Sequence, residues 1–318
     1  MKYSYIRPKH YVTYYTWLLL FNVVCFFVFF GIAYLDDVNM INNGYVNKNS
    51  VTFRMEAIKQ PIKESSHHFI LFQYRTSVPT VKHVWSNGKI KLPPIKESHL
   101  ADELNQNGDV AIIGESVKID QIPSGYQFIG YFDTPDSYKL QTEIWLLSKQ
   151  LDIDLNNGTQ FILNTPSHHT EEIMREITNN NTVKIINKEK YGSYALKSNQ
   201  FATVVGYVTI FFITILFVIV SIAWLSKESS LISILYLSGY SIRKICSVII
   251  KYKVLPYIFF SVILIIISVI VQSIMIPLWS TAWILYSTYM IILYSLILLW
   301  ISYTYGILYS VRRGGKKW

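Results

Sequence analysis

The chain has 318 residues, of which 51% are hydrophobic, and its formal net charge is +9. Residues 1–11, 226–253 and 306–318 together hold 12 of the 29 Lys and Arg but one of the 20 Asp and Glu. Positive charge beside apolar stretches is typical of membrane topology and argues against a nucleic-acid-binding surface. Both cysteines, Cys25 and Cys246, fall outside residues 36–200, which excludes a disulfide-stapled domain there.

Four apolar stretches are long enough for membrane-spanning helices, which need about 20 mostly apolar residues. They cover residues 12–35, 202–225, 254–276 and 282–305. The first is too long for the apolar core of a secretory signal, so we expect a retained signal anchor. No acidic or basic residue falls within the four stretches, which argues against an ion pathway.

The basic flanks of these stretches predict the orientation, because Lys and Arg accumulate on the cytoplasmic side. Both termini and the connection 226–253 are therefore expected in the cytoplasm, and residues 36–200 outside it. The sequence thus predicts a multi-pass protein of the cell membrane with four transmembrane helices in a 1+3 arrangement.

Residues 36–200 change to the periodicity of short strands and helices. A helix is predicted over 171–179, where Ser167 or Thr170 can cap the N-terminus and Glu171 and Glu172 suit the positive end of the dipole. The predicted strands cover 51–58, 68–76, 109–114, 126–132, 144–147, 159–163 and 183–186. We expect an α+β extracytoplasmic domain between the first and second helices, with stalks at 36–50 and 191–200.

The segment 226–245 between the second and third helices is the main functional candidate, because it is basic, amphipathic and predicted to face the cytosol. Gly239 is expected to end its helix as a left-handed C-cap. An alternative interpretation is an ordinary interfacial helix held by anionic lipid. The candidate residues are Lys227, Glu228, Leu231, Ile234, Leu235, Gly239, Ser241, Arg243 and Lys244, with Leu231, Ile234 and Leu235 expected on a buried stripe.

Three features resemble the permease subunits of type VII ABC transporters, the FtsX-like or MacB-like family. One is the order of one helix, a large domain and three helices. Another is KESSLISILYLSGYSIRKI, which is similar to the family's coupling segment. The third is SNGKIKLPPIKESHLADELNQNGDVAIIGESVKI followed by YQFIGYFDTPDS, which resembles the core-domain pattern with Gly88-Lys89 at its turn, Ala111–Ser116 at its second element and Phe128–Gly130 at its third.

The resemblance implies a non-enzymatic permease that works with a cytoplasmic ABC ATPase and a second permease, either identical or a paralogue. The sequence has no GxxxxGK[ST] phosphate loop, so ATP and Mg are expected in the ATPase and no cofactor in this chain. The implied domains are residues 1–35 with the first helix, the MacB-like domain 36–200, and residues 201–318 with the coupling segment 226–253.

Two functions stay open within this plan. The first is export or extraction of a peptide-like or hydrophobic substrate. The second is mechanical regulation of a cell-wall hydrolase or sensor partner. Outside this plan, a receptor without an ATPase is a third hypothesis, against which the coupling pattern of the cytoplasmic segment argues. The histidines of the outer domain lack metal-ligand spacing and are read as surface or capping residues; they are His67, His68, His83, His99, His168 and His169.

Overall fold

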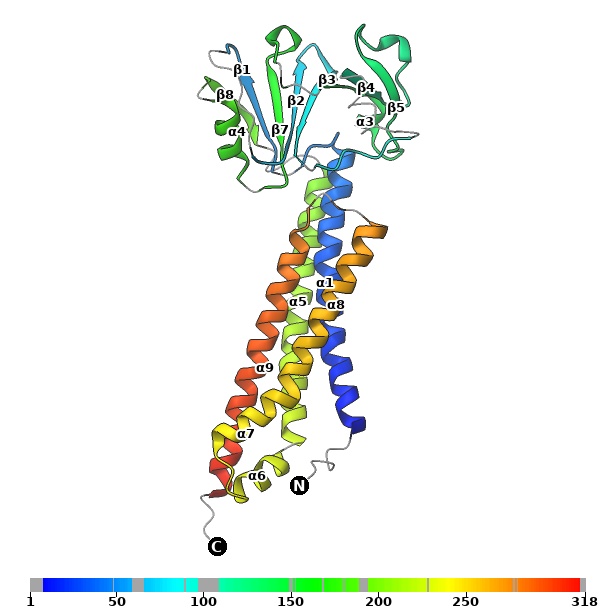
Figure 1. Cartoon of the computed structure of the whole chain (residues 1–318). Helices are drawn as coiled ribbons and strands as arrows, with labels where there is room; N and C mark the ends of the chain where they lie inside the picture. The colour runs from blue at the N-terminus through cyan, green and yellow to red at the C-terminus, as the bar shows by residue number, and fades with distance from the viewer. Residues whose placement is uncertain are drawn as a thin grey trace. The chain divides into compact units, whose positions relative to one another are not determined.

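The computed structural model describes residues 8–47, 49–58, 66–88, 90–96, 109–148, 151, 153–167, 169–179, 181–188, 194–227, 229–276, 278 and 280–314 (Figure 1). The chain divides into two compact units. A helical unit contains residues 1–33, 201–277 and 281–318, and a sheet unit contains residues 34–200 and 278–280.

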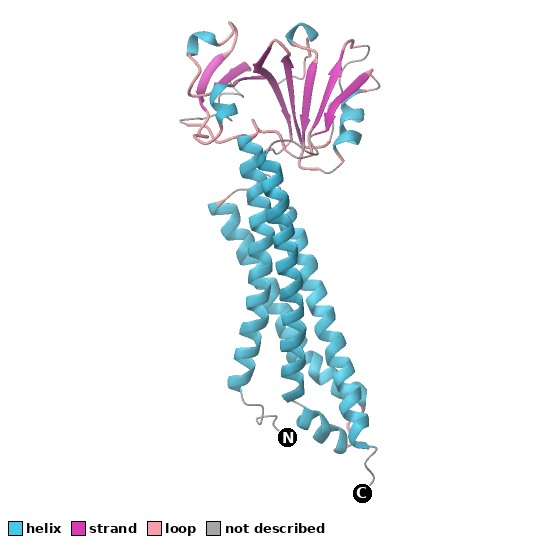
Figure 2. Cartoon of the chain, turned by 180° about the vertical axis from the view of Figure 1, so that it is seen from behind, coloured by secondary structure: helices cyan, strands magenta, loops and turns pink. Residues whose placement is uncertain are grey.

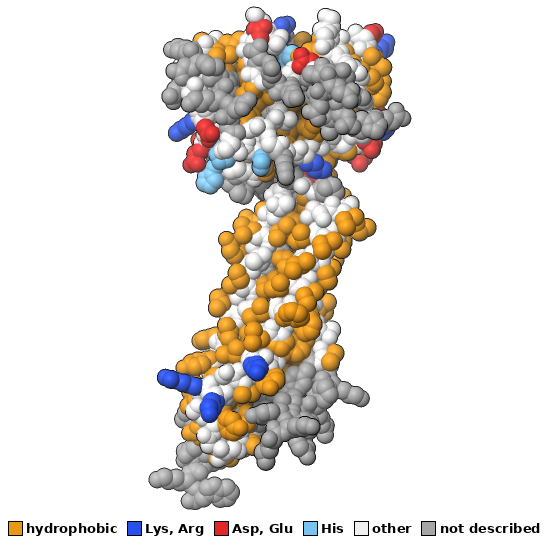
Figure 3. Space-filling model, in the orientation of Figure 1, with side chains coloured by type: hydrophobic (Ala, Val, Ile, Leu, Met, Phe, Trp, Pro, Cys, Tyr) orange, Lys and Arg blue, Asp and Glu red, His pale blue; other side chains and the backbone are white. Residues whose placement is uncertain are grey.

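Four long apolar helices dominate the helical unit, and each could cross a membrane by length and composition. They are α1 (Pro8–Asn42), α5 (Tyr194–Lys227), α8 (Leu255–Met275) and α9 (Ala282–Gly314). Hydrophobic side chains predominate on the face of this unit shown in Figure 3, and the Lys and Arg side chains visible there gather toward the end that carries α7. The four predicted apolar stretches are thus confirmed as helices that are long and apolar enough to cross a membrane.

Helix α8 matches the predicted third stretch, but the continuous helix that contains it begins earlier. Helix α7 (Ile242–Ile249) and a π-helical turn (Ile250–Val254) lead directly into α8, so that Ile242–Met275 forms one candidate span. Hydropathy placed the start near Val254 because two lysines, Lys251 and Lys253, interrupt the apolar run. The predicted stretch 254–276 itself carries no charged residue, and the basic residues Arg243, Lys244, Lys251 and Lys253 lie in the helical extension that precedes it.

Polar contacts between side chains join the helices of this unit. Asn22 of α1 donates from Nδ2 to Ser261 Oγ at 2.8 Å and accepts from Tyr257 Oη at 3.0 Å, both on α8. Tyr294 Oη of α9 lies 3.2 Å from Thr214 Oγ1 of α5. Because apolar burial does not drive helix association in lipid, such hydrogen bonds fix the register of neighbouring helices.

The strands of the sheet unit are drawn in magenta in Figure 2. In the described residues they form one eight-stranded sheet in the order β5-β4-β6-β3-β2-β7-β1-β8. The β3–β6 and β4–β5 pairs are parallel and the other neighbours antiparallel. Two short 3-10 helices, Ile119–Gln121 and Leu155–Asn157, interrupt the loops. The strands are β1 (Val51–Met55), β2 (Phe69–Arg75), β3 (Val78–Asn87), β4 (Asp109–Ile113), β5 (Gln127–Tyr131), β6 (Ile144–Ser148), β7 (Gln160–Asn164) and β8 (Val183–Lys188).

Both faces of the sheet are covered by apolar side chains. Helix α4 (Thr170–Thr178) packs Ile173, Met174 and Ile177 against β1, β2 and β7. On the other face, Leu140 of α3 (Tyr138–Thr142) joins a core that includes Phe72 and Trp145. The predicted mixture of strands and helices between the first and second membrane helices is thereby confirmed.

Two local predictions for this unit are wrong. The sequence did not predict β3, because Pro79, Lys82 and His83 break the alternation of apolar residues that marks a strand. The predicted side-chain cap of α4 is absent: its N-cap residue, His169, makes no capping hydrogen bond. Ser167 Oγ instead accepts a hydrogen bond from the backbone N–H of His169.

Candidate functional site

The α6–α7 segment, Ser229–Ile249, contains most of the candidate coupling residues. Helix α6 (Ser229–Leu237) ends in a left-handed residue, Gly239, with φ +83°. The N–H of Gly239 donates to the carbonyl of Tyr236 at 3.0 Å, and that of Tyr240 to Leu235 at 3.1 Å. These two bonds form a Schellman motif, so the predicted glycine C-cap is confirmed.

Ser241 starts the next helix immediately after this turn. Its Oγ accepts a hydrogen bond from the N–H of Lys244 at 3.4 Å, which satisfies one of the free donors at the start of α7. Arg243 and Lys244 are exposed, whereas Cys246 packs beside Gly306 of α9. A methyl group at Gly306 would lie 2.9 Å from Cys246 Sγ, so this glycine permits the close approach of α7 and α9.

The buried face of α6 differs from the predicted stripe. Ile232 and Ser233 are buried, while Ile234 is 60% exposed and Leu235 is half-buried. The stripe is therefore wrong for Ile234, because α6 packs against α9 along a face one or two positions away. Glu228 and the side chain of Leu231 lie outside the described residues.

The exposed face of α6 consequently carries apolar residues. Ile234 and Leu237, which is 68% exposed, lie three positions apart and share one side of the helix. Lys227 before α6 and the pair Arg243 and Lys244 after it are also exposed. An apolar face between cations is a surface suited to a protein partner with an apolar groove and an acidic rim.

A second feature lies in the sheet unit, where residues 34–45 form part of the core. Met40 and Tyr45 are almost completely buried, and the Tyr45 ring meets Trp145 edge-on with ring centroids 5.7 Å apart. Ser137 Oγ donates to the carbonyl of Ile41 at 2.7 Å, and Asn164 Nδ2 donates to that of Tyr45 at 2.7 Å. The last two turns of α1 are thus fixed to the sheet.

A buried ion pair lies beside this attachment. Lys82 Nζ contacts Glu143 Oε1 at 2.6 Å, and Trp145 Nε1 donates to Glu143 Oε2 at 2.8 Å. Burial lowers the pKa of Lys82, and the carboxylate of Glu143 opposes that shift. Sequence reasoning missed both the ion pair and the attachment, because their partners are distant in the chain and carry no local pattern.

The described histidines make separate contacts. His67 Nε2 lies 3.5 Å from Glu176 Oε2, and His169 Nδ1 lies 3.5 Å from Glu172 Oε2. Burial lowers the pKa of His83, whose ring lies near Trp85 and Tyr126. Among the described residues, no three His, Cys, Asp or Glu side chains are grouped to hold a metal ion.

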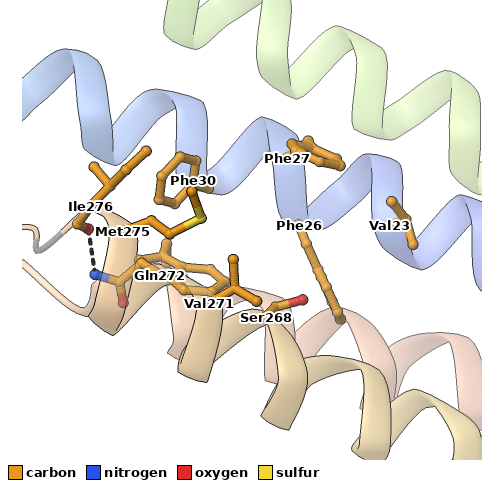
Figure 4. A pocket seen from close by; sticks show the side chains of 10 residues that line it. Val23, Phe26, Phe27, Phe30, Ser268, Val271, Gln272, Met275 and Ile276 are labelled. Atoms are coloured by element: carbon orange, nitrogen blue, oxygen red, sulfur yellow. Dashed lines mark hydrogen bonds between the residues drawn. The ribbon is translucent and has the colours of Figure 1, made fainter.

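An apolar cavity of about 250 Å³ lies within the helical unit between α1, α8 and α9 (Figure 4). The polar side chains that line it include Ser268 and Gln272, and Gln272 Nε2 donates to the carbonyl of Ile276 at 2.8 Å. The other residues that line it are Val23, Phe26, Phe27, Phe30, Val271, Met275 and Trp283. The composition of this wall suits a hydrocarbon chain or another apolar group.

Two of the segments that carry the family resemblance, in β4 and β5, are neighbours in the sheet, and β3 is separated from β4 by β6. Ala111 of β4 pairs with Phe128 of β5 in the parallel ladder, and Gly88 follows β3 in a left-handed conformation with φ +76°. Lys89 lies outside the described residues. No family model matches the chain, and no curated protein matches it.

Proposed function

We propose that this chain is a non-catalytic permease subunit of an ABC transporter of the FtsX-like or MacB-like kind. The observation that carries the proposal is the α6–α7 segment, which presents exposed Ile234 and Leu237 between exposed cations at a connection between two membrane helices. A separate ABC ATPase binds this surface on the cytoplasmic side. The permease works with a second permease, identical or related.

The proposed work is movement of the domain 36–200 outside the cell, driven by ATP hydrolysis in the partner. The attachment of residues 34–45 to the sheet supports this proposal, because a displacement of α1 would then be imposed on the domain core. Because protein interiors are closely packed, a movement of α1 would be passed on to the sheet rather than absorbed at the attachment. The ATPase holds the nucleotide and Mg, and this chain holds no cofactor.

Two outcomes of that movement remain, and each has one supporting observation. Export or extraction of a hydrophobic or peptide-like substrate is supported by the apolar cavity between α1, α8 and α9. Mechanical regulation of a cell-wall hydrolase or sensor is supported by the attachment of residues 34–45 to the sheet. We propose transport as the function and mechanical regulation as the alternative.

The ATPase surface is tested by copurification of a tagged chain with a coexpressed ABC ATPase. Ile234→Asp places a charge in the centre of the proposed contact, and we expect a loss of about 2 kcal/mol or more, a drop in affinity of roughly thirtyfold. Ile234→Met keeps an apolar side chain of similar size at the same position and is the matched control. It should retain the partner.

The competing interpretation makes a different prediction for the same assay. If the segment binds only anionic lipid, Ile234→Asp leaves copurification unchanged, while neutralising Lys227, Arg243 and Lys244 together weakens membrane-surface contact in a salt-dependent way. A wild-type chain that binds no ABC ATPase would contradict both transport and mechanical regulation.

A further inference from the structure

The third membrane helix changes its hydrogen-bond pattern at the π turn Ile250–Val254, which joins α7 to α8. A π turn inserts one extra residue into an α-helix, and such turns occur mostly at functional sites. Each residue of an α-helix turns the chain by about 100°. If the extra residue moves along the helix, the helical segment that it passes therefore rotates about the helix axis.

Helix α1 holds the backbone of this turn through one side chain. Tyr15 Oη donates a hydrogen bond to the carbonyl of Tyr252 at 2.7 Å and lies 3.3 Å from the carbonyl of Lys253. Both contacts depend on the register of the turn, because shifting the extra residue would move these two carbonyls around the helix. Tyr15 thus fixes the π turn where it stands.

A second contact fixes the same turn from α5. The side chain of Lys253 is buried, and its Nζ lies 2.8 Å from the centroid of the Trp224 ring. Trp224 also stacks on Tyr14 of α1, with the ring centroids 4.0 Å apart and 9° between the planes. A cation on an aromatic face is strongly attracted when both are removed from water, and ionisable groups buried in membrane helices commonly have a function.

We propose that the π turn is a latched joint: Tyr15 and the Lys253–Trp224 contact hold it, and their release lets α7 rotate about its axis relative to α8. The joint lies between the α6–α7 segment and the rest of the third helix, so a force on that segment acts on the latch. This inference goes beyond the proposed function, and its test needs no ATPase.

The native thiol of Cys246 reports the rotation. In the latched state Cys246 is 7% exposed and its Sγ lies against Gly306. A rotation of about 100° would carry it away from α9. Cys25 of α1, which is fully buried beside Tyr294 at 3.4 Å, serves as the internal reference for an intact bundle.

The experiment measures the rates at which N-ethylmaleimide modifies the two cysteines of the full chain in lipid nanodiscs, followed by mass spectrometry. Tyr15→Phe removes the donor, and Lys253→Met removes the cation. Loss of one such contact should raise the ratio of Cys246 to Cys25 labelling roughly fivefold. Deleting Lys251 removes the extra residue, and it should leave Cys246 accessible throughout.

Tyr252→Phe is the matched control, because it removes a hydroxyl from the same turn while the backbone carbonyl that Tyr15 contacts stays in place. It should label as the wild type does. The proposal requires a raised ratio in at least one latch variant and in the deletion variant. The proposal would be overturned if the ratio of Cys246 to Cys25 labelling stayed at the wild-type value in both latch variants, or in the deletion variant.

Discussion

At the scale of single residues, the sequence is most informative where the cause of a conformation is local. Gly239 was predictable because a glycine after an apolar helical run commonly takes the left-handed conformation, and its φ is +83°. The burial of Lys82 was not predictable. A lysine is buried only with a partner, and the partner, Glu143, lies 61 positions away in the chain.

Gly239 allows a test of backbone strain without steric conflict. A Cβ there would meet nothing within 4 Å, so Gly239→Ala costs only the left-handed conformation, about 1–2 kcal/mol. Gly31→Ala is the control, because Gly31 also has nothing within 4 Å but lies inside α1 without a positive φ. In detergent, we expect Gly239→Ala to lower the melting temperature by a few degrees and Gly31→Ala to leave it unchanged or raise it. Equal melting temperatures for the Gly239→Ala and Gly31→Ala variants would contradict the expected backbone strain at residue 239.

At the scale of elements, periodicity predicted those whose burial pattern is regular. Seven of the eight strands in the described residues and the apolar cores of all four long helices follow from alternating or continuous apolar residues, although the helices extend up to nine residues beyond three of the predicted stretches and further before the third. β3 and the start of the third helix were missed for one shared reason. In both, lysines stand where the pattern demands apolar residues, and the tertiary partners that allow this, Glu143 for Lys82 and Trp224 for Lys253, are invisible in a local window.

The end of α1 behaves as an element of the sheet unit, which sets the boundary of an autonomous domain. A fragment covering 34–200 should be soluble and unfold cooperatively. A fragment beginning at residue 46 loses Met40 and Tyr45 from the core and should be less stable by roughly 2–5 kcal/mol for each. Denaturant unfolding followed by circular dichroism compares the two.

A metal chelator serves as the control for the same fragments. It should leave their stability unchanged if the histidines have surface roles. Equal stability of the long and short fragments would show that residues 34–45 do not belong to the core, and a requirement for zinc would show that the histidines were misjudged.

At the scale of the whole molecule, the distribution of charge and the packing of α7 together decide how the orientation must be tested. The basic flanks predict a cytoplasmic α6–α7 segment and an outer domain 36–200. Cys246 cannot report that orientation in the wild type, because its protection follows from packing against α9 whichever side it faces. A reporter must be exposed in the folded protein.

Two exposed serines can serve as reporters, one in each of the regions that are expected on opposite sides of the membrane. Ser86 in β3 and Ser238 after α6 are both exposed. In a chain whose two native cysteines are replaced by serine, Ser86→Cys should react with a membrane-impermeant maleimide on intact cells. Ser238→Cys should react only after the membrane is permeabilised, because the 12 flanking cations predict that its side faces the cytoplasm. If Ser238→Cys were labelled on intact cells, the orientation would be the opposite of the predicted one, and the proposed ATPase-binding surface would lie outside the cell.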